Sequence, residues 1–325
     1  MAGAIWVIGV SGPAGLARVS GELATLARTL GAAAEREPVG VVVAADPAPA
    51  AKELAAFLPR VLAVTEPLAA EQTVAATIAG RIAALVEREK PAYLLLGATP
   101  DGRDLAGMLS ALLGWGVLVN ASAVAWTSDG PSVEMSVFGG KLLTTSSFVE
   151  DHGILTVRPN SVNALPGDSP GTVEAVEIAS SAELPVVKVS ERVNEASAAA
   201  PIEEARVIVA GGRGVGGPDG FHVVEELAEA LGGAVGATRA AVDSGWIPFS
   251  QQIGQTGKIV KPDLYLALGV SGAIQHKVGM QTAGTIVAVN RDPDAPIAEF
   301  ADMFVVGDLF EVVPAIIAEL RSRSG

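Results

Sequence analysis

Short apolar runs alternate with segments of helical periodicity along the first part of the chain. Apolar runs bounded by turn residues are typical of buried strands, and apolar residues three and four positions apart are typical of helices. Such alternation predicts a parallel sheet with right-handed helical crossovers. The predicted strands are Ala4–Val10, Val39–Ala45, Arg60–Thr65 and Ala92–Ala98, and the predicted helices are Ala17–Ala33, Ala50–Phe57, Gln72–Glu89 and Arg103–Leu113.

From Val117 to about Val189 the pattern changes to short apolar runs with no room for helices between them. We expect these runs either to extend the first sheet with antiparallel strands or to form a small additional β layer. The runs are Val133–Phe138, Leu142–Val149, Ile154–Val157, Val173–Ile178 and Val186–Val189.

A small, acidic segment, Asn194–Ala205, interrupts the pattern, and such composition marks domain boundaries. The strand and helix alternation then resumes, which predicts a second α/β domain. The sequence therefore predicts an N-terminal α/β domain over residues 1–193, a linker over 194–205 and a C-terminal domain over 206–325. The C-terminal elements are strands Arg206–Ala210, Leu264–Val270, Thr285–Asn290 and Met303–Val306, and helices Phe221–Leu231, Ala273–Met280 and Leu309–Arg323.

Composition excludes several classes of function. With 36 acidic against 22 basic residues, the net charge of −14 disfavours a nucleic-acid binder. The absence of Cys excludes disulfides, thiolate nucleophiles, iron–sulfur clusters and Cys-zinc sites, and 3 His residues leave little for another metal site. Mean hydropathy is positive at +0.43, but no uninterrupted apolar stretch is long enough for a spanning helix. We expect a soluble, cytoplasmic protein without a signal peptide.

The turn after the predicted strand Arg206–Ala210 is rich in glycine. Gly212, Gly214 and Gly217 satisfy the dinucleotide fingerprint, in which bare backbone lets a pyrophosphate approach a helix N-terminus. The acidic ribose contact about 20 residues further on is missing. The motif is compatible with a dinucleotide site or with a flexible turn, and Arg213 inside the turn favours an anion.

A second motif follows the predicted strand Leu264–Val270. Gly269–Ala273 nearly spells G-x-S-x-G, the nucleophile elbow of α/β hydrolases, but no His follows His276 to complete a triad. A Ser-Gly pair at a helix start more naturally offers its amides and hydroxyl to a phosphate.

The polar loop Gln252–Lys258 resembles a P-loop only superficially, because Ile259 replaces the residue that would hold magnesium. It can bind the edge of a heterocycle or form a surface turn. Arg239 can likewise form a surface salt bridge, Asn290 an Asx turn and Asp308 a helix N-cap. Taken together, these groups at strand and loop ends of one domain favour a dinucleotide site.

The C-terminal third resembles the alpha subunit of electron-transfer flavoproteins. The resemblance spans most of the chain, since Gly97–Gly114 and Thr156–Pro159 are similar to the same family. The C-terminal segments that carry it, in order and spacing, are Ala237–Trp246, Gln252–Lys258, Pro262–His276, Ile286–Pro296 and Val305–Pro314.

The resemblance implies that the C-terminal domain is a Rossmann-like FAD-binding domain. It places Arg213, Ser271 and Gly272 at the pyrophosphate, beside the start of helix Ala273–Met280. Asn290, Asp308 and Leu309 match the adenosine end. It also places Arg239 and His276 closest to the flavin ring, where Arg239 is always charged and His276 could become charged when the flavin is reduced. The positions matching the ribityl chain and the ring are Thr238, Arg239, Ile253, Gly254, Gln255, Thr256, Gln275 and His276, with Gln252, Ala273 and Ile274 as further cofactor contacts.

The family role is electron transfer. The resemblance implies that electrons come from dehydrogenases, above all the acyl-CoA dehydrogenases of fatty acid β-oxidation, and pass to a membrane quinone oxidoreductase. It implies a heterodimer with a separate AMP-binding beta subunit. An electron carrier needs no nucleophile or general base of its own, so no catalytic residue and no metal are expected. The alternatives are an NAD- or adenylate-binding α/β protein and a structural subunit with an empty site.

Overall fold

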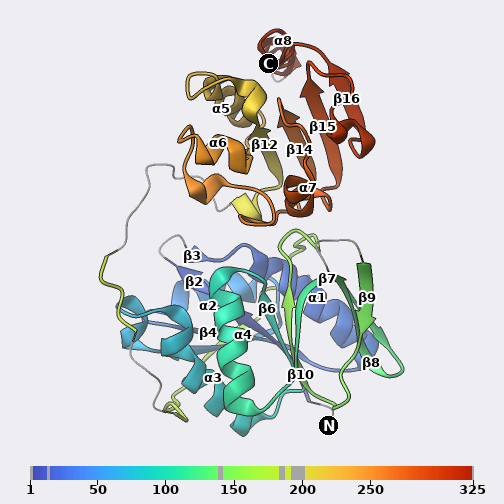
Figure 1. Ribbon diagram of the computed structural model, residues 1–325. Coiled ribbons are helices and arrows are strands. Elements are labelled where there is room, and N and C mark those ends of the chain that lie inside the picture. The colour runs from blue at the N-terminus through green and yellow to red at the C-terminus, as the bar shows by residue number, and fades with distance from the viewer. Residues whose placement is uncertain (1–2, 13–14, 138–141, 183–186, 192–201, 324–325) are drawn as a thin grey trace. The chain divides into compact units, whose positions relative to one another are not determined.

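The computed structural model describes the chain except for residues 1–2, 13–14, 138–141, 183–186, 192–201 and 324–325. The chain divides into two compact units, Met1–Asn194 and Glu195–Gly325 (Figure 1). Most of the predicted linker, 194–205, lies outside the described residues, so its extent stays a prediction. Among the described residues, no helix is both long and apolar enough to cross a membrane.

The first unit is built on a nine-stranded sheet in the order β11-β5-β4-β1-β6-β10-β7-β8-β9. Two-residue strands β2 (Ser11–Gly12) and β3 (Gly15–Leu16) pair separately. The strands of the large sheet are β1 (Ile5–Gly9), β4 (Pro38–Ala44), β5 (Arg60–Thr65), β6 (Tyr93–Gly97), β7 (Val117–Thr127), β8 (Gly130–Val137), β9 (Leu142–Ser146), β10 (Gly153–Val157) and β11 (Thr172–Ala175). The helices are α1 (Val19–Ala34), α2 (Ala48–Ala55), α3 (Val74–Glu89) and α4 (Pro100–Leu113), with a 3-10 turn at Pro67–Ala70.

Alternate residues of the central strand enter two separate cores. Ile5 and Val7 of β1 pack with α1 and α2 on one face, whereas Trp6 and Ile8 pack with α3 and α4 on the other. A strand buried on both faces reads as a continuous apolar run, which explains why the sequence pattern identified it. The unit is a three-layer α/β/α sandwich.

The short runs after Val117 extend the first sheet, and the fold class predicted for this domain is confirmed. The pairs β7–β8 and β8–β9 are antiparallel. The prediction of antiparallel strands is wrong for the other two described runs, because β10 is parallel to both β6 and β7, and β11 is parallel to β5. Residue 186 of the last run lies outside the described residues, while Lys188 forms an isolated bridge with Gln72.

The second unit contains a five-stranded parallel sheet in the order β13-β12-β14-β15-β16. Its strands are β12 (Val207–Gly211), β13 (Ala234–Ala237), β14 (Leu264–Leu268), β15 (Thr285–Asn290) and β16 (Met303–Val306), and its helices are α5 (Phe221–Ala230), α6 (Arg239–Asp243), α7 (Ile274–Met280) and α8 (Leu309–Arg323). Further 3-10 turns lie at Ile202–Glu204, Arg213–Val215, Phe249–Gln251 and Pro296–Glu299.

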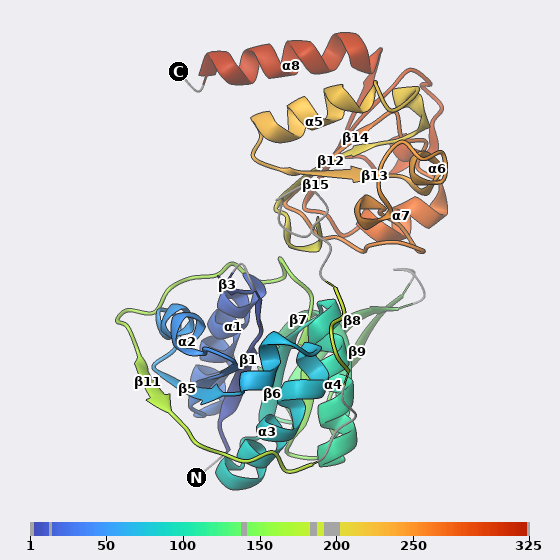
Figure 2. The ribbon, with the colours of Figure 1, turned by 90° about the vertical axis from the view of Figure 1, so that its left-hand side faces the viewer.

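Helices cover both faces of this sheet. Figure 2 shows α5 and α8 side by side on one face, where Phe221 and Val313 join one buried cluster. Met280 of α7 and Ile297 belong to the cluster on the opposite face. The sequence pattern missed β13, because its AVGA is short and small, and pairing with β12 decides its conformation.

Candidate functional site

The predicted site residues of the second unit follow the carboxyl ends of its parallel strands. Arg213 follows β12, Thr238 and Arg239 follow β13, and Ser271 follows β14. Strand order reverses between β12 and β14, since the chain goes from β12 outward to β13 and then returns to the other side. Open α/β sheets bind ligands outside the carboxyl ends of the strands at such a switch point.

The two loops at this switch point are in direct backbone contact. The N–H of Gly212 donates to the carbonyl of Leu268 at 2.9 Å, and that of Gly214 donates to the carbonyl of Gly269 at 3.0 Å. A Cβ on Gly214 would stand 2.7 Å from the Cα of Gly269, closer than real side chains approach. These glycines therefore permit loop-to-loop packing, which is a different reason from the open phosphate cradle that the fingerprint predicts.

The loop of residues 252–256 enters the site from between α6 and β14. Ile253 donates its N–H to the carbonyl of Ala237 at 2.9 Å, and Gln255 donates to the carbonyl of Gln275 at 2.8 Å. These bonds attach the loop to the end of β13 on one side and to α7 on the other. The structure thus brings together three segments that the sequence analysis selected separately.

Several side chains at this edge have no polar partner among the residues that the structure describes. Within that part of the chain, the hydroxyl of Thr238 and the Oε1 of Gln251 are buried and make no hydrogen bond. Arg213 is exposed, and its guanidinium forms no ion pair with any residue that the structure describes. Ile274 is an apolar side chain that is 67% exposed. Buried polar atoms are normally satisfied, so the unpaired Thr238 hydroxyl indicates a place where a ligand binds.

The structure shows the surroundings of His276 without a bound flavin, so its charge on flavin reduction stays a prediction. The ring is 6% exposed, and burial lowers its pKa to about 4, although the bond to the Ile253 carbonyl acts in the opposite direction. Its Nε2 lies 2.8 Å from the hydroxyl of Tyr265, and its Nδ1 lies 3.0 Å from the carbonyl of Ile253. A buried histidine with both nitrogens bonded in this way is neutral at pH 7.

Three other predicted contacts have local partners. Arg239 pairs with Asp243 at 3.1 Å, with both side chains more than half exposed. Asn290 accepts from the N–H of Asp292 at 3.1 Å and donates to the carbonyl of Val270 at 2.9 Å.

Asp308 caps α8 by accepting the N–H of Phe310 at 2.9 Å, and it pairs with Arg291 at 2.6 Å. The backbone bond, followed by the bond to Arg291, lowers the pKa of Asp308. The salt bridge, the Asx turn and the N-cap that the sequence left open are all present. The cofactor contacts of these residues stay predictions.

His276 is not placed to act as a base for Ser271. His276, the one histidine near it in the sequence, directs both ring nitrogens to other groups. Within the described part of the chain, no three His, Asp or Glu residues are grouped so that they could hold a metal ion. Ser271 and His276 therefore do not form the nucleophile and base pair of a hydrolase.

Sequence reasoning missed Tyr265 and Gln251. Tyr265 is a fully buried residue of β14 whose hydroxyl bonds to His276. The available signal was a phenol in the middle of an apolar strand, since a buried Tyr hydroxyl generally finds a partner. Gln251 directly precedes the segment that was selected.

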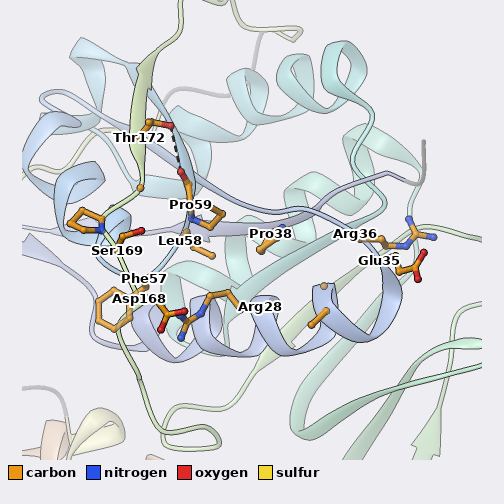
Figure 3. A pocket seen from close by; sticks show the side chains of 15 residues that line it. Arg28, Glu35, Arg36, Pro38, Phe57, Leu58, Pro59, Asp168, Ser169 and Thr172 are labelled. Carbon is orange, nitrogen blue, oxygen red and sulfur yellow. Dashed lines mark hydrogen bonds between the residues drawn. The ribbon is translucent and has the colours of Figure 1, made fainter.

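The first unit has a separate hollow of about 620 Å³, lined by Arg28, Phe57 and Asp168 among others (Figure 3). It lies by Pro38 and Pro59, at the amino ends of β4 and β5, which is the edge opposite to the usual ligand edge of such sheets. The guanidinium of Arg28 bonds to the carbonyls of Leu165 and Pro166 at 2.5 and 3.2 Å. We assign no function to this hollow.

Comparisons with known proteins agree across both units. Residues 201–281 match the family model described as electron transfer flavoprotein FAD-binding domain, and residues 5–210 match the electron transfer flavoprotein domain. The chain is 45% identical over 313 residues to electron transfer flavoprotein subunit alpha of Mycobacterium leprae, covering 95% of this chain and 96% of that protein. The corresponding subunit of Mycobacterium tuberculosis is 43% identical with the same coverage. That of Bacillus subtilis is 41% identical, covering 73% of each chain.

Proposed function

The chain belongs to the family of electron transfer flavoprotein alpha subunits, and from this membership we propose how its second unit holds FAD and which proteins exchange electrons with it. The main observation behind this proposal is that four loops meet at the switch point between β12 and β14. They are the loops after β12, β13 and β14 and the loop of residues 252–256. FAD is a dinucleotide, and this edge is where parallel α/β sheets bind dinucleotides.

The residues present fit the cofactor. The unpaired hydroxyl of Thr238 is buried. The backbone N–H of the same residue donates to the carbonyl of Gly211 at 3.0 Å, which places Thr238 beside the end of β12. A ligand with ring nitrogens, hydroxyls and carbonyls supplies the partner that this hydroxyl lacks. The unpaired Gln251 oxygen gives a second such group at the same loop.

We assign the pyrophosphate to Arg213, Ser271 and Gly272, with the first amides of α7. A cation and free N–H groups stabilise phosphate charge. Asn290, Asp308 and Leu309 face the adenosine end. The ribityl chain and the ring contact Thr238, Arg239, Gln252, Ile253, Gly254, Gln255, Thr256, Ala273, Ile274, Gln275 and His276.

The flavin supplies the redox chemistry, and the residues of this chain bind it, orient it and set its electrostatic surroundings. Arg239 places a permanent positive charge at the start of α6, partly offset by Asp243. His276 lies against the adjacent loop, with its Nδ1 3.0 Å from the carbonyl of Ile253.

We propose that the electrons come from dehydrogenases of the acyl-CoA dehydrogenase type in fatty acid β-oxidation and pass to a membrane quinone oxidoreductase. The active form is a cytoplasmic heterodimer with an AMP-binding beta subunit. Family membership supports these assignments.

The test is co-expression with the beta subunit, followed by purification, nucleotide extraction and counting of FAD and AMP. We expect one FAD and one AMP per heterodimer, and reduction of the flavin by an acyl-CoA dehydrogenase with its substrate. Extraction of NAD or of an adenylate alone in place of FAD would support the alternative of an NAD- or adenylate-binding protein.

A further inference from the structure

A network of three hydrogen-bonded polar groups lies inside the second unit, behind the 252–256 loop. It consists of the Tyr265 hydroxyl on β14, the His276 ring on α7 and the main-chain carbonyl of Ile253. Tyr265 is 0% exposed and His276 is 6% exposed.

The geometry of this network determines which of its atoms carry a proton. The carbonyl of Ile253 can only accept, so Nδ1 of His276 carries a proton and donates. Nε2 is then the acceptor of the neutral ring, and the Tyr265 hydroxyl donates to it. Burial favours the neutral form of both groups, raising the pKa of Tyr265 and lowering that of His276.

The hydrogen bond from the His276 ring to Ile253 adds to backbone contacts between the same loop and α7. Gln255 donates to the carbonyl of Gln275, and Val260 donates to the carbonyl of Gly279, each at 2.8 Å. A Cβ on Gly279 would stand 2.6 Å from the Cα of Gly254. Since both positions are glycine, the loop lies directly on α7, and the short imidazole can reach the carbonyl of Ile253.

We propose that Tyr265 is a positioning residue of the flavin site, which holds the His276 ring in the orientation that fixes Ile253 and thereby the loop carrying Gln252, Gln255 and Thr256. Without the hydroxyl, Nε2 is a buried acceptor with no donor, and the ring loses one of its two attachments. The inference rests on the proposed contact between the flavin and this loop.

The first experiment measures the protonation and hydrogen bonding of the His276 ring nitrogens. The full chain, in complex with an unlabelled beta subunit, is prepared with ¹⁵N-histidine, and the 3 histidines are observed by NMR. In the wild type we expect His276 to show a protonated Nδ1 and a hydrogen-bonded, unprotonated Nε2 at pH 7. In Tyr265→Phe we expect the Nε2 resonance to shift to that of a free acceptor and the Nδ1 proton to exchange faster with water.

Tyr93→Phe is the matched control, because it removes the hydroxyl of the other tyrosine, which is buried in the first unit. It should leave the His276 resonances unchanged. A protonated Nε2 in the wild type, or an unchanged Nε2 shift in Tyr265→Phe, would overturn the proposal.

The second experiment links the ring to the flavin. In His276→Asn the amide nitrogen stands at the position of Nδ1 and can still donate to Ile253, whereas in His276→Gln it stands at the position of Nε2. We expect FAD to dissociate about tenfold more readily from His276→Gln, which loses the bond to Ile253, the effect of about one lost buried hydrogen bond. Tyr265→Phe and His276→Asn keep the donor to Ile253 but lose the bond between positions 265 and 276, so we expect a smaller loss of FAD from both. Equal loss from the Asn and Gln variants would overturn the positioning role while leaving FAD as the cofactor, whereas a wild type without FAD would refute the proposed site itself.

Discussion

At the scale of single residues, a substitution of Ser271 can show whether this residue binds phosphate or caps a helix. Its side chain is exposed, and it precedes the N-cap of α7, which is Ala273, by two positions. A carboxylate here would therefore gain no capping role. We expect Ser271→Asp to weaken FAD binding about 100-fold, because two like charges about 5 Å apart repel by roughly 3 kcal/mol at an effective dielectric of 20.

Flavin content after dialysis and FAD titration of the apoprotein measure this effect. Ser271→Ala is the control, since it removes only the hydroxyl and should cost a few-fold at most. Full flavin retention by Ser271→Asp would remove Ser271 from the pyrophosphate site.

Substitution of Arg239 tests the electrostatic surroundings of the flavin ring. Its charge is permanent and its side chain is 65% exposed, so solvent reduces its effect. We expect Arg239→Ala to lower the reduction potential of the bound flavin by tens of millivolts, since a nearby cation favours the added electron.

Asp243→Asn provides the opposite change, because it removes the carboxylate that pairs with Arg239 at 3.1 Å. It should raise the potential slightly. If spectroelectrochemical titration gives the wild-type potential for Arg239→Ala with FAD fully bound, Arg239 does not lie beside the ring.

At the scale of elements, the contact between α7 and the 252–256 loop depends on small residues. A methyl group on Gly279 would collide with the backbone of Gly254 and with Ile253, at 2.6 Å from the Gly254 Cα. We expect Gly279→Ala to lower the free energy of unfolding by about 1–3 kcal/mol, as overpacking does, and to weaken FAD binding by displacing the loop.

Gly107→Ala is a matched control in α4 of the first unit, where an added Cβ meets nothing within 4 Å. It should raise the free energy of unfolding by about 0.5–1 kcal/mol, because alanine is the better helix former. Urea unfolding and flavin retention compare the two variants, and similar effects of both changes would contradict the close packing.

At the scale of the whole molecule, the buried His276 predicts how stability depends on pH. Its pKa is about 4 in the folded chain, against about 6.5 when unfolded. The unfolded chain therefore binds more protons between these values, so the free energy of unfolding falls as the pH drops from about 6.5 to about 4. The total loss is on the order of 3 kcal/mol.

Urea unfolding of the full chain at pH 7, 6 and 5 measures this loss. His276→Asn keeps a donor at the same position but does not titrate, so its stability should fall less over the same range. Parallel curves for the two proteins would show that His276 is not buried and neutral.

Local sequence determined most strands of both sheets and the loops that carry the site. Strands such as β12 and β14 are buried on both faces and are therefore continuous apolar runs. Residues at the ends of parallel strands gather at one edge of the sheet whatever the strand order, so Arg213, Thr238 and Ser271 were identifiable in advance.

Only the tertiary structure decided the pairing of β13, the parallel insertion of β10 and the role of His276. The conformation of β13 depends on its neighbour β12, and β10 takes its place by pairing parallel to both β6 and β7. His276 bonds to Ile253 and Tyr265, which lie 23 and 11 residues away. Burial lowers the pKa of His276, and both hydrogen-bond partners of the ring come from other elements, so the sequence around His276 could not show its surroundings.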